Sequence, residues 1–408
     1  MKTHFDAVIV GAGPAGSSAA IWLAQAGWRV ALVEKQTFPR RKVCGECLSA
    51  SNLPLLETLG MGAAFAALAG PELRQVALMR GNHTVVAELP TADDSRFPWG
   101  RALGRETLDT LLLEQAQSKG VQVMQPWALQ GFYGGPGKWR CEVRRVDTQT
   151  LLNLHAPVAI DAHGSWEALP SERMHHVCNV SDLLAFKANF SGASLPPGLL
   201  PVLSFEGGYG GMVLADQGLL TLACCIRRDR LTALRLASPG ASAGEVVETL
   251  LKRECAGVGA ALLSATRVGA WLATGSLATG IRLRADDPVF RIGNAAAEAH
   301  PITGEGMSLA FQGAWLLCTH LIGSGVHPTL HDGTWQRAVG HAYAKDWHQQ
   351  FGPRLRLAAA LAHLAMRPAL AAPLLALVRA WPGFLPLAAT WGGKTRSITT
   401  TTTTRSPS

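Results

Sequence analysis

The sequence predicts an α/β protein in which a parallel sheet with helices is interrupted by a mostly antiparallel domain and followed by C-terminal helices. The N-terminal region has the pattern of a strand, a helix and a second strand, at residues 6–10, 14–27 and 29–33. Residues 187–228 are rich in strand patterns. Residues 355–389 are strongly apolar but are broken by Arg and Pro residues, which favours several packed or surface-lying helices over one membrane span.

The size and composition indicate a globular protein. With 408 residues, of which 48% are hydrophobic, the chain can form two or three domains with sizeable cores. The net charge is +8, but the basic residues are scattered, so we expect no nucleic-acid partner. The surplus charge favours an anionic cofactor or an acidic membrane surface. No segment of signal-peptide form precedes the first strand, so we expect a cytoplasmic protein despite its eight cysteines.

Elements of the first half follow from local patterns. Residues 53–68 predict a helical segment, and residues 105–119 predict an amphipathic helix. Residues 76–89 predict a hairpin that turns at Gly81-Asn82. Short strands between residues 121 and 160 are expected to belong to the first domain.

The second half returns to the first domain after the strand-rich segment. Residues 244–255 predict one helix that covers the strands of residues 187–228. Residues 289–292 predict a buried strand, which leads into a glycine-rich segment and a helix through Ile322. The Thr tract at 399–408 is expected to be disordered.

Gly11, Gly13 and Gly16 lie between the first predicted strand and the first predicted helix. Gly11 permits the tight turn, Gly13 lets a pyrophosphate approach the backbone, and Gly16 allows close packing of helix and strand. The free amides at the helix start attract the anion. Glu34, at the end of the second strand, can accept hydrogen bonds from a ribose diol. This pattern predicts a Rossmann-like domain that binds a dinucleotide, but it does not distinguish NAD from FAD.

Three further segments decide the cofactor. The first is Phe38-Pro39-Arg40-Arg41-Lys42-Val43-Cys44-Gly45-Glu46, the second is Arg105 followed by Leu108-Asp109 and Leu112, and the third is Gly293-Asn294-Ala295-Ala296 with Pro301 and Gly304-Glu305-Gly306-Met307. Together with the glycine motif they resemble the FAD-dependent oxidoreductases that include geranylgeranyl reductases and, more distantly, p-hydroxybenzoate hydroxylase-type aromatic monooxygenases.

The resemblance implies a role for each segment. The first is similar to the loop that passes the FAD pyrophosphate and the flavin, the second to the helix whose first arginine approaches the cofactor, and the third to the segment that binds ribitol and the pyrimidine edge. We therefore expect FAD as the bound cofactor and NAD(P)H as its reductant. The expected cofactor-binding residues are Gly11, Gly13, Ala15, Gly16, Glu34, Lys35, Arg40, Cys44, Gly45, Arg105, Asp161, Gly164, Gly293, Asn294, Pro301, Gly304, Gly306 and Met307.

The chain departs from this family at three places. Asn294 stands where the group usually has Asp, so one negative charge near the ribitol is missing. In Asp161-Ala162-His163-Gly164 the Asp and Gly of a second dinucleotide motif are separated by two residues. Gly208-Tyr209-Gly210-Gly211-Met212-Val213 begins like the substrate motif of prenyl reductases but lacks its Trp, Phe and Pro.

Three residues are candidates for catalysis: Cys44, His300 and Glu305. Cys44 and Cys47 have the spacing of a dithiol redox site, although no thioredoxin-like elements surround them, and no second ligand pair accompanies them, so we expect no metal site. His300 and Glu305 flank the flavin-binding turn and could act as acid or base. A structural role for His300, bonding a loop carbonyl, is the favoured reading.

The expected organisation is a Rossmann-like FAD-binding domain with an inserted, mostly antiparallel β substrate domain and C-terminal helices. The FAD-binding domain takes residues 1–75, 100–175 and 280–330, and the substrate domain takes 76–99 and 176–279. Residues 331–396 form the C-terminal helical region and 397–408 the tail.

For the reaction we favour an NAD(P)H-dependent monooxygenase that hydroxylates an apolar aromatic or polyketide-like metabolite of secondary metabolism. One alternative is a reductase of carbon-carbon double bonds in a prenyl or lipid substrate. Another is a non-catalytic flavin-binding redox sensor. The Trp-x-Trp-x-Ile-Pro signature of halogenases is absent. Residues 355–389 predict either peripheral membrane contact, with Arg356, Arg367 and Arg379 as snorkelling cations, or a helical cover on the substrate domain, which is favoured.

Overall fold

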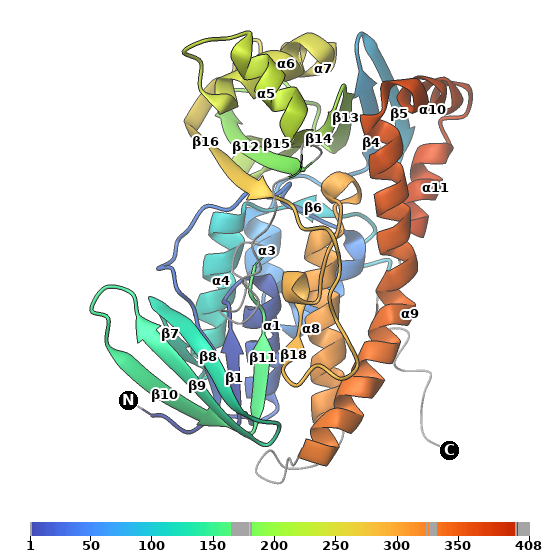
Figure 1. The fold of residues 1–408 in the computed structure, drawn as a ribbon. Coiled ribbons are helices and arrows are strands. Elements are labelled where there is room, and N and C mark those ends of the chain that lie inside the picture. The colour runs from blue at the N-terminus through green and yellow to red at the C-terminus, as the bar shows by residue number, and fades with distance from the viewer. Residues whose placement is uncertain are drawn as a thin grey trace.

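The computed structural model describes residues 2–164, 182–323 and 333–395, together with Asn179, Gly325 and Ile398. The predicted Thr-rich tail at 399–408 lies outside the described residues. Two sheets with their helices occupy opposite ends of the molecule, and the long helix α9 runs beside both (Figure 1). The division into domains at the residue numbers given above stays a prediction.

A five-stranded parallel sheet forms the end of the molecule that contains the N-terminus. Its order is β18-β11-β1-β2-β7, built from β1 (Ala7–Val10), β2 (Val30–Val33), β7 (Gln122–Met124), β11 (Val158–Asp161) and β18 (Phe290–Arg291). Every residue of β1, β2 and β11 is buried, as expected of a sheet covered on both faces. The predicted strand, helix and strand at the N-terminus are confirmed, with α1 (Pro14–Gln25) between β1 and β2.

Different layers cover the two faces of this sheet. One face packs against α1, α4 (Arg105–Ser118) and α8 (Gly306–Gly323). The other packs against an antiparallel three-stranded sheet of β8 (Trp127–Gly135), β9 (Lys138–Arg145) and β10 (Leu151–Ala156). The short strands β3 (Cys47–Leu48) and β6 (Arg101–Ala102) pair with each other, as do β17 (Gly280–Ile281) and β19 (Ala297–Glu298).

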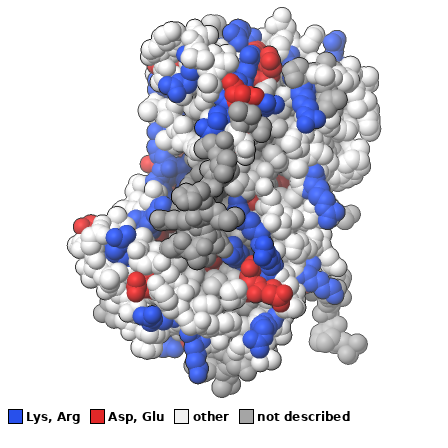
Figure 2. Space-filling view, in the orientation of Figure 1, with Lys and Arg blue, Asp and Glu red and all other residues white. Residues whose placement is uncertain are grey.

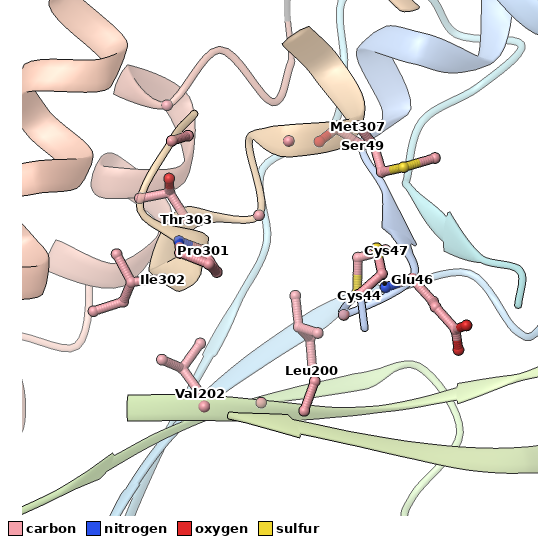
Figure 3. Close-up of a pocket in the computed structure, with 18 of the residues that line it drawn as sticks. Cys44, Glu46, Cys47, Ser49, Leu200, Val202, Pro301, Ile302, Thr303 and Met307 are labelled. Carbon is pink, nitrogen blue, oxygen red and sulfur yellow. Dashed lines mark hydrogen bonds between the residues drawn. The ribbon is translucent and has the colours of Figure 1, made fainter. Parts of the chain in front are cut away.

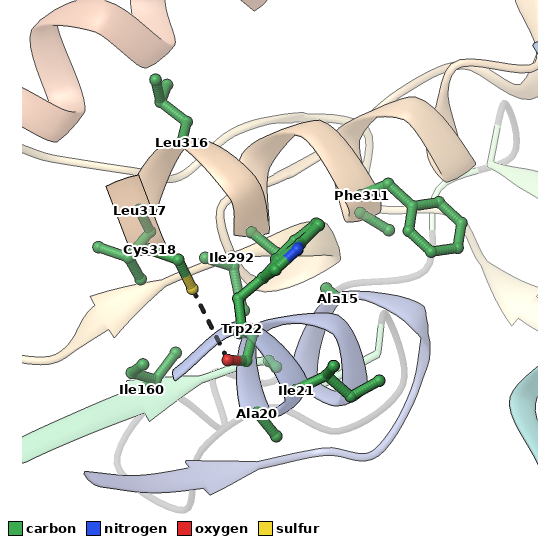
Figure 4. Close-up of a cluster of buried hydrophobic side chains, with 14 of the residues drawn as sticks. Ala15, Ala20, Ile21, Trp22, Ile160, Ile292, Phe311, Leu316, Leu317 and Cys318 are labelled. Atoms are coloured by element: carbon green, nitrogen blue, oxygen red, sulfur yellow. Dashed lines mark hydrogen bonds between the residues drawn. The ribbon is translucent and has the colours of Figure 1, made fainter. Parts of the chain in front are cut away.

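Helices α1 and α8, which are almost 300 residues apart in sequence, pack side by side (Figure 4). The Cys318 thiol donates to the carbonyl oxygen of Ala19 at 3.7 Å, and the rings of Trp22 and Trp315 meet edge to face at 5.2 Å. This packing places the start of α8 beside the start of α1. The segment at residues 293–307 is thereby brought next to the glycine loop at residues 11–16.

A seven-stranded sheet forms the other end, in the order β16-β12-β15-β14-β13-β4-β5. Its strands are β4 (Gln75–Arg80), β5 (His83–Glu88), β12 (Leu183–Ser191), β13 (Leu199–Phe205), β14 (Gly208–Ala215), β15 (Leu219–Arg227) and β16 (Thr266–Ser276). The predicted hairpin at Gly81-Asn82 is confirmed as β4 and β5. All pairs are antiparallel except β4 with β13, which is parallel.

Successive side chains along these strands face opposite ways. Ala77 and Met79 of β4 belong to the core that the sheet forms with α5 (Arg228–Leu236), α6 (Ala243–Glu254) and α7 (Ala256–Ala261). Val76 and Leu78 face the opposite side and line a cavity. The predicted helix at residues 244–255 is confirmed as α6, which begins with a capping box between Ser242 and Glu245.

One helical expectation needs correction. Residues 53–68 form two helices, α2 (Leu53–Thr58) and α3 (Gly62–Leu68), because the chain turns at Gly60, whose φ is 77°. The C-terminal helices are α9 (Gly333–Met366), α10 (Pro368–Ala380) and α11 (Phe384–Trp391), which lie within the helical region expected at residues 331–396. Within the described part of the chain, no helix combines the length and apolarity needed to cross a membrane.

Candidate active site

A cavity of about 500 Å³ lies where the glycine-rich segments meet the seven-stranded sheet. Fifteen of the predicted cofactor-binding residues line it: Gly11, Gly13, Ala15, Glu34, Arg40, Cys44, Gly45, Arg105, Gly164, Gly293, Asn294, Pro301, Gly304, Gly306 and Met307. Residues from five separate stretches of sequence, at 11–15, 34–45, 105, 164 and 293–307, therefore converge on one space.

The glycine loop has the close approaches that were expected of it. Gly11 has a φ of 102°, and a Cβ there would lie 2.5 Å from the carbonyl oxygen of Ala162. A Cβ at Gly16 would lie 1.9 Å from the carbonyl oxygen of Gly11, so Gly16 serves packing and does not line the cavity. Gly13 differs, because a Cβ there would meet no backbone and would lie 3.8 Å from terminal nitrogens of both Arg40 and Arg105.

The two arginines face Gly13 across the cavity. Arg105 donates from Nε and from one terminal nitrogen to the two carboxylate oxygens of Asp109, at 2.7 Å each. Burial opposes the charge of Arg105, but the Asp109 carboxylate raises the pKa of the guanidinium above its ordinary value. Arg40 lies 3.5 Å from Glu34 and 3.8 Å from Asp109, and its buried Nε has no hydrogen-bond partner among the described residues. An anion between these arginines would fit their charge.

Glu34 is fixed by the backbone around it. Its two carboxylate oxygens accept hydrogen bonds from the amides of Ala12, at 3.0 Å, and Gln36, at 2.9 Å. The side chain is 3% exposed, yet it still lines the cavity next to the glycine loop. This position suits the ribose diol that the sequence pattern predicts.

Lys35 and Asp161, which were predicted to bind cofactor, do not line the cavity. Asp161 lies at the end of the buried strand β11 and accepts a hydrogen bond from the amide of His163 at 3.0 Å. The Asp161 carboxylate also contacts the His163 ring, and His163 itself lines the cavity. Asp161 thus positions a lining residue, which the loose motif around Gly164 did not indicate.

Glu305 is engaged with two cations and does not line the cavity. It is 1% exposed and forms ion pairs with Arg354 of α9 and, at 3.0 Å, with Lys394. Lys394 also donates to the carbonyl oxygen of Gly304 at 3.1 Å. These contacts tie the C-terminal region to the turn before α8. They favour a structural role for Glu305 over the acid or base role suggested above.

His300 also lies behind the turn and not on the cavity surface. One ring nitrogen is 3.5 Å from the Tyr209 hydroxyl and the other is 3.3 Å from the Thr279 hydroxyl. Burial, with a smaller effect from His363, lowers the pKa of His300 below its ordinary value, so the ring is neutral at pH 7. Its bonds are to hydroxyl groups, whereas we expected a loop carbonyl.

Cys44 and Cys47 are both free thiols that line the cavity. The Cys44 sulfur accepts a hydrogen bond from the Glu46 amide at 3.3 Å. Burial raises the pKa of the Cys47 thiol to about 12. Because a thiolate is the reactive form, Cys47 is a poor partner for dithiol exchange. Among the described residues, no cluster of His, Cys, Asp and Glu has the makeup of a metal site.

The sequence reasoning missed the buried pair of Glu46 and Lys187. Glu46 has a φ of 61° and is 1% exposed, and its carboxylate forms an ion pair with Lys187 of β12. It also accepts hydrogen bonds from the Arg105 amide at 2.8 Å and from the Thr221 hydroxyl at 2.5 Å. This network fixes the cysteine-containing loop to the seven-stranded sheet. A lysine within the apolar pattern of residues 183–191 was the only sequence signal.

The remainder of the cavity wall is mainly apolar. Leu200 and Val202 stand on β13 and point toward the turn of Pro301, Ile302 and Thr303 (Figure 3). Residues of α9, α10 and α11 complete the wall, among them Leu361, Ala365, Leu375, Val378, Phe384, Leu385, Ala388 and Ala389. The C-terminal helices are therefore a cover over this cavity, which agrees with the favoured reading of residues 355–389.

The residues present fit FAD. The gap in front of Gly13, the Arg40 nitrogen that has no partner among the described residues and the buried carboxylate of Glu34 lie on one cavity and fit an ADP half. The amides at the start of α8, next to Gly304 with its φ of 62°, are available to an electronegative ring edge. Asn294 lines the same wall.

Comparisons with known proteins agree with this geometry. A family model described as an FAD binding domain matches residues 4–324. The menaquinone reductase of Mycolicibacterium smegmatis is 36% identical over 124 residues, which make up 30% of this chain and only 29% of that protein. The match thus spans less than a third of the relative's length.

Solved structures extend the likeness of fold over most of the chain. The flavin-dependent brominase Bmp2 has a TM-score of 0.75 at 18% identity, covering 96% of this chain and 94% of that one. A geranylgeranyl bacteriochlorophyll reductase-like protein of Thermoplasma acidophilum has a TM-score of 0.68 at 16% identity, with coverages of 87% and 85%. The predicted α/β fold class is confirmed. The chain therefore belongs to the FAD binding domain family.

Proposed function

We propose that this protein is an NAD(P)H-dependent flavin monooxygenase that hydroxylates an apolar aromatic or polyketide-like metabolite. The observation that carries the proposal is the shared cavity, in which the FAD-side turn at Pro301 faces an apolar wall of β13 under the C-terminal helices. The sequence has one full dinucleotide motif, at Gly11, so the nicotinamide is proposed to visit transiently.

In this reaction the substrate, dioxygen, NAD(P)H and a proton give the hydroxylated product, water and NAD(P)+. Bound FAD would supply the transfer of electrons from the nicotinamide to dioxygen. Arg40 and Arg105 would hold the pyrophosphate of FAD, and the amides at the start of α8 would stabilise negative charge close to that helix end. Helices α9 to α11 limit the access of water to the apolar wall.

Oxygen consumption tests the proposal. The FAD-loaded protein is mixed with NADPH or NADH and a panel of phenolic and polyketide-like compounds. We expect at least one compound to accelerate both NAD(P)H oxidation and oxygen uptake in step, and anaerobic turnover to stop after one flavin reduction. A protein whose FAD is never reduced by NAD(P)H would contradict the proposal and favour the redox sensor.

A double-bond reductase is the second candidate. The local similarity to a menaquinone reductase favours it, and Cys44 beside the cavity is consistent with it. The altered segment around Tyr209 speaks against it, although Tyr209 does line the cavity. A product heavier by two hydrogens that accumulates without oxygen would select this candidate. The brominase-like fold does not add halogenation as a further candidate reaction, because the halogenase signature is missing.

We also propose that the protein is cytoplasmic and touches membranes peripherally through α10 and α11. Trp381, between the two helices, and Trp391, at the end of α11, are 52% and 58% exposed, and Leu377 of α10 is 47% exposed. Such side chains suit a lipid surface when the basic residues nearby meet anionic headgroups. On the face shown in Figure 2, Lys and Arg side chains are spread over both ends with Asp and Glu between them. Flotation with anionic liposomes at low salt tests the contact, and complete absence of binding would leave the cover role alone.

A further inference from the structure

One row of side chains crosses the seven-stranded sheet on the face that lines the cavity. Ser204 of β13 pairs with Tyr209 of β14, which pairs with Cys225 of β15. Arg80 of β4 lies next to Ser204, because Met79 and Leu203 are in register and the two strands are parallel. All four residues line the cavity. The row therefore begins at an arginine and leads to Tyr209, whose hydroxyl lies 3.5 Å from His300 at the flavin-side turn.

Arg80 has little to neutralise its charge. It donates one hydrogen bond, at 2.9 Å, to the Ser204 hydroxyl, which in turn donates to the carbonyl oxygen of Ala365 on α9 at 3.3 Å. Within the described residues no carboxylate lies at ion-pair distance from Arg80. The acidic residue close by in the fold is Glu254, whose backbone carbonyl accepts from the Gly81 amide. Its carboxylate is already engaged with Arg230 and Arg253.

Three other cations of the cavity lie close to carboxylates. Arg105 binds Asp109, Arg40 lies near Glu34, and Lys394 binds Glu305. These three lie on the cofactor side. On the sheet side, Ser204 is the polar neighbour of Arg80, and the other lining side chains close by are apolar, with Leu78 two residues earlier on the same strand and Val202 on β13. A guanidinium with unused donors in apolar surroundings favours an anionic ligand, because a carboxylate can accept two parallel hydrogen bonds from it.

We propose that Arg80 binds the carboxylate of the substrate, so that the substrate class is an apolar aromatic acid. The inference rests on the proposed function, because it takes the apolar part of the cavity as the substrate site. Arg80 and Tyr209 are two strands apart, which corresponds to about 10 Å. A molecule held by its carboxylate at Arg80 therefore presents its opposite end, about two fused rings away, to the turn at Pro301. Arg80 fixes both the orientation of the substrate and the position that reacts.

Binding of matched acids and amides tests this role without turnover. The probes are 2-naphthoate and biphenyl-4-carboxylate, each compared with its neutral carboxamide, titrated into the FAD-loaded protein by calorimetry. The wild-type protein should bind at least one acid about tenfold to a hundredfold more tightly than its amide. Arg80→Met should abolish that preference while changing amide affinity by less than about threefold, and Arg80→Lys should keep part of it.

Arg253→Met is the matched control, because it removes the same charge from a helix residue whose side chain is 60% exposed. It should leave the preference for acids unchanged. FAD content and melting temperature show that each variant is folded. Equal binding of acid and amide by the wild-type protein, or a preference that survives in Arg80→Met, would overturn the assignment. Neither result depends on oxygen or NAD(P)H, so a failure of the monooxygenase proposal would be seen separately.

Discussion

Replacing Gly13 by valine tests the pyrophosphate site directly. A Cβ at this position would meet no backbone atoms, so the backbone around it need not move. It would, however, stand in the gap between Arg40 and Arg105, at 3.8 Å from a terminal nitrogen of each. A phosphate oxygen bound by either arginine needs to lie about 2.8 Å from its nitrogen. The valine methyl groups would therefore occupy the volume that the phosphates need.

The size of the effect follows from the two arginine hydrogen bonds that the phosphates could no longer accept. A hydrogen bond to a charged group contributes about 1.5–3 kcal/mol, so the absence of both amounts to roughly 3–6 kcal/mol. The affinity for FAD should fall by about a hundredfold to ten-thousandfold. Absorbance of the released flavin per chain, followed by titration of the apoprotein with FAD, measures this.

Gly135→Val is the control for the loss of a glycine. Gly135 lies in the hairpin of β8 and β9, and a Cβ there would meet nothing within 4 Å. This variant should keep a full complement of FAD. If Gly13→Val also retained FAD at wild-type affinity, the phosphates would lie elsewhere and the reasoning from the glycine loop would be refuted.

Three further predictions concern titratable side chains. Glu305→Gln should lower the free energy of unfolding by about 3 kcal/mol, measured in urea, because Arg354 and Lys394 lose their carboxylate partner. The pKa of His300 lies below the ordinary 6.5, so the unfolded chain binds more protons than the folded one between the two values. Stability should therefore fall as the pH drops below about 6.5, and melting temperatures should show a smaller fall for His300→Gln. Because burial raises the pKa of Cys47 to about 12, iodoacetamide at about pH 8 should leave this thiol unlabelled in the folded protein, as mass spectrometry can show.

The parts of the site that could be predicted from the sequence are those with local causes. The glycine loop, Glu34 at the end of β2 and Arg105 at the start of α4 each follow from a strand or helix boundary within a few residues. The structure places all of them on one cavity. Their use in holding FAD, residue by residue, stays a proposal that Gly13→Val and related variants can test.

The missed features depend on contacts between distant segments. Arg80 lies in a hairpin that could be predicted, but its neighbour Ser204 is set by the parallel pairing of β4 with β13. Local periodicity contains no information on that pairing. Likewise, Lys187 meets Glu46 only because β12 lies against the cysteine-containing loop. Asp161 does not line the cavity, because a short motif fixes a position in the sequence but not the direction of the side chain, which here turns to His163.

The C-terminal helices show the same limit. Their composition suits a membrane surface and a protein interior equally well, because both accept apolar faces. The structure places Leu361, Val378 and Phe384 on the cavity while Trp381 stays exposed. Only the tertiary arrangement distinguishes the positions that line the cavity from the exposed position, because all four lie within residues 361–384.

The fate of dioxygen is the most direct test of the proposed monooxygenase. The FAD-loaded protein is supplied with NAD(P)H, a compound that accelerates its oxidation, and ¹⁸O-labelled dioxygen, and the product is analysed by mass spectrometry. We expect a product that carries one labelled oxygen atom, formed in step with NAD(P)H consumption. A product that contains no labelled oxygen and has gained two hydrogens, formed equally well without dioxygen, would contradict it and establish the reductase alternative.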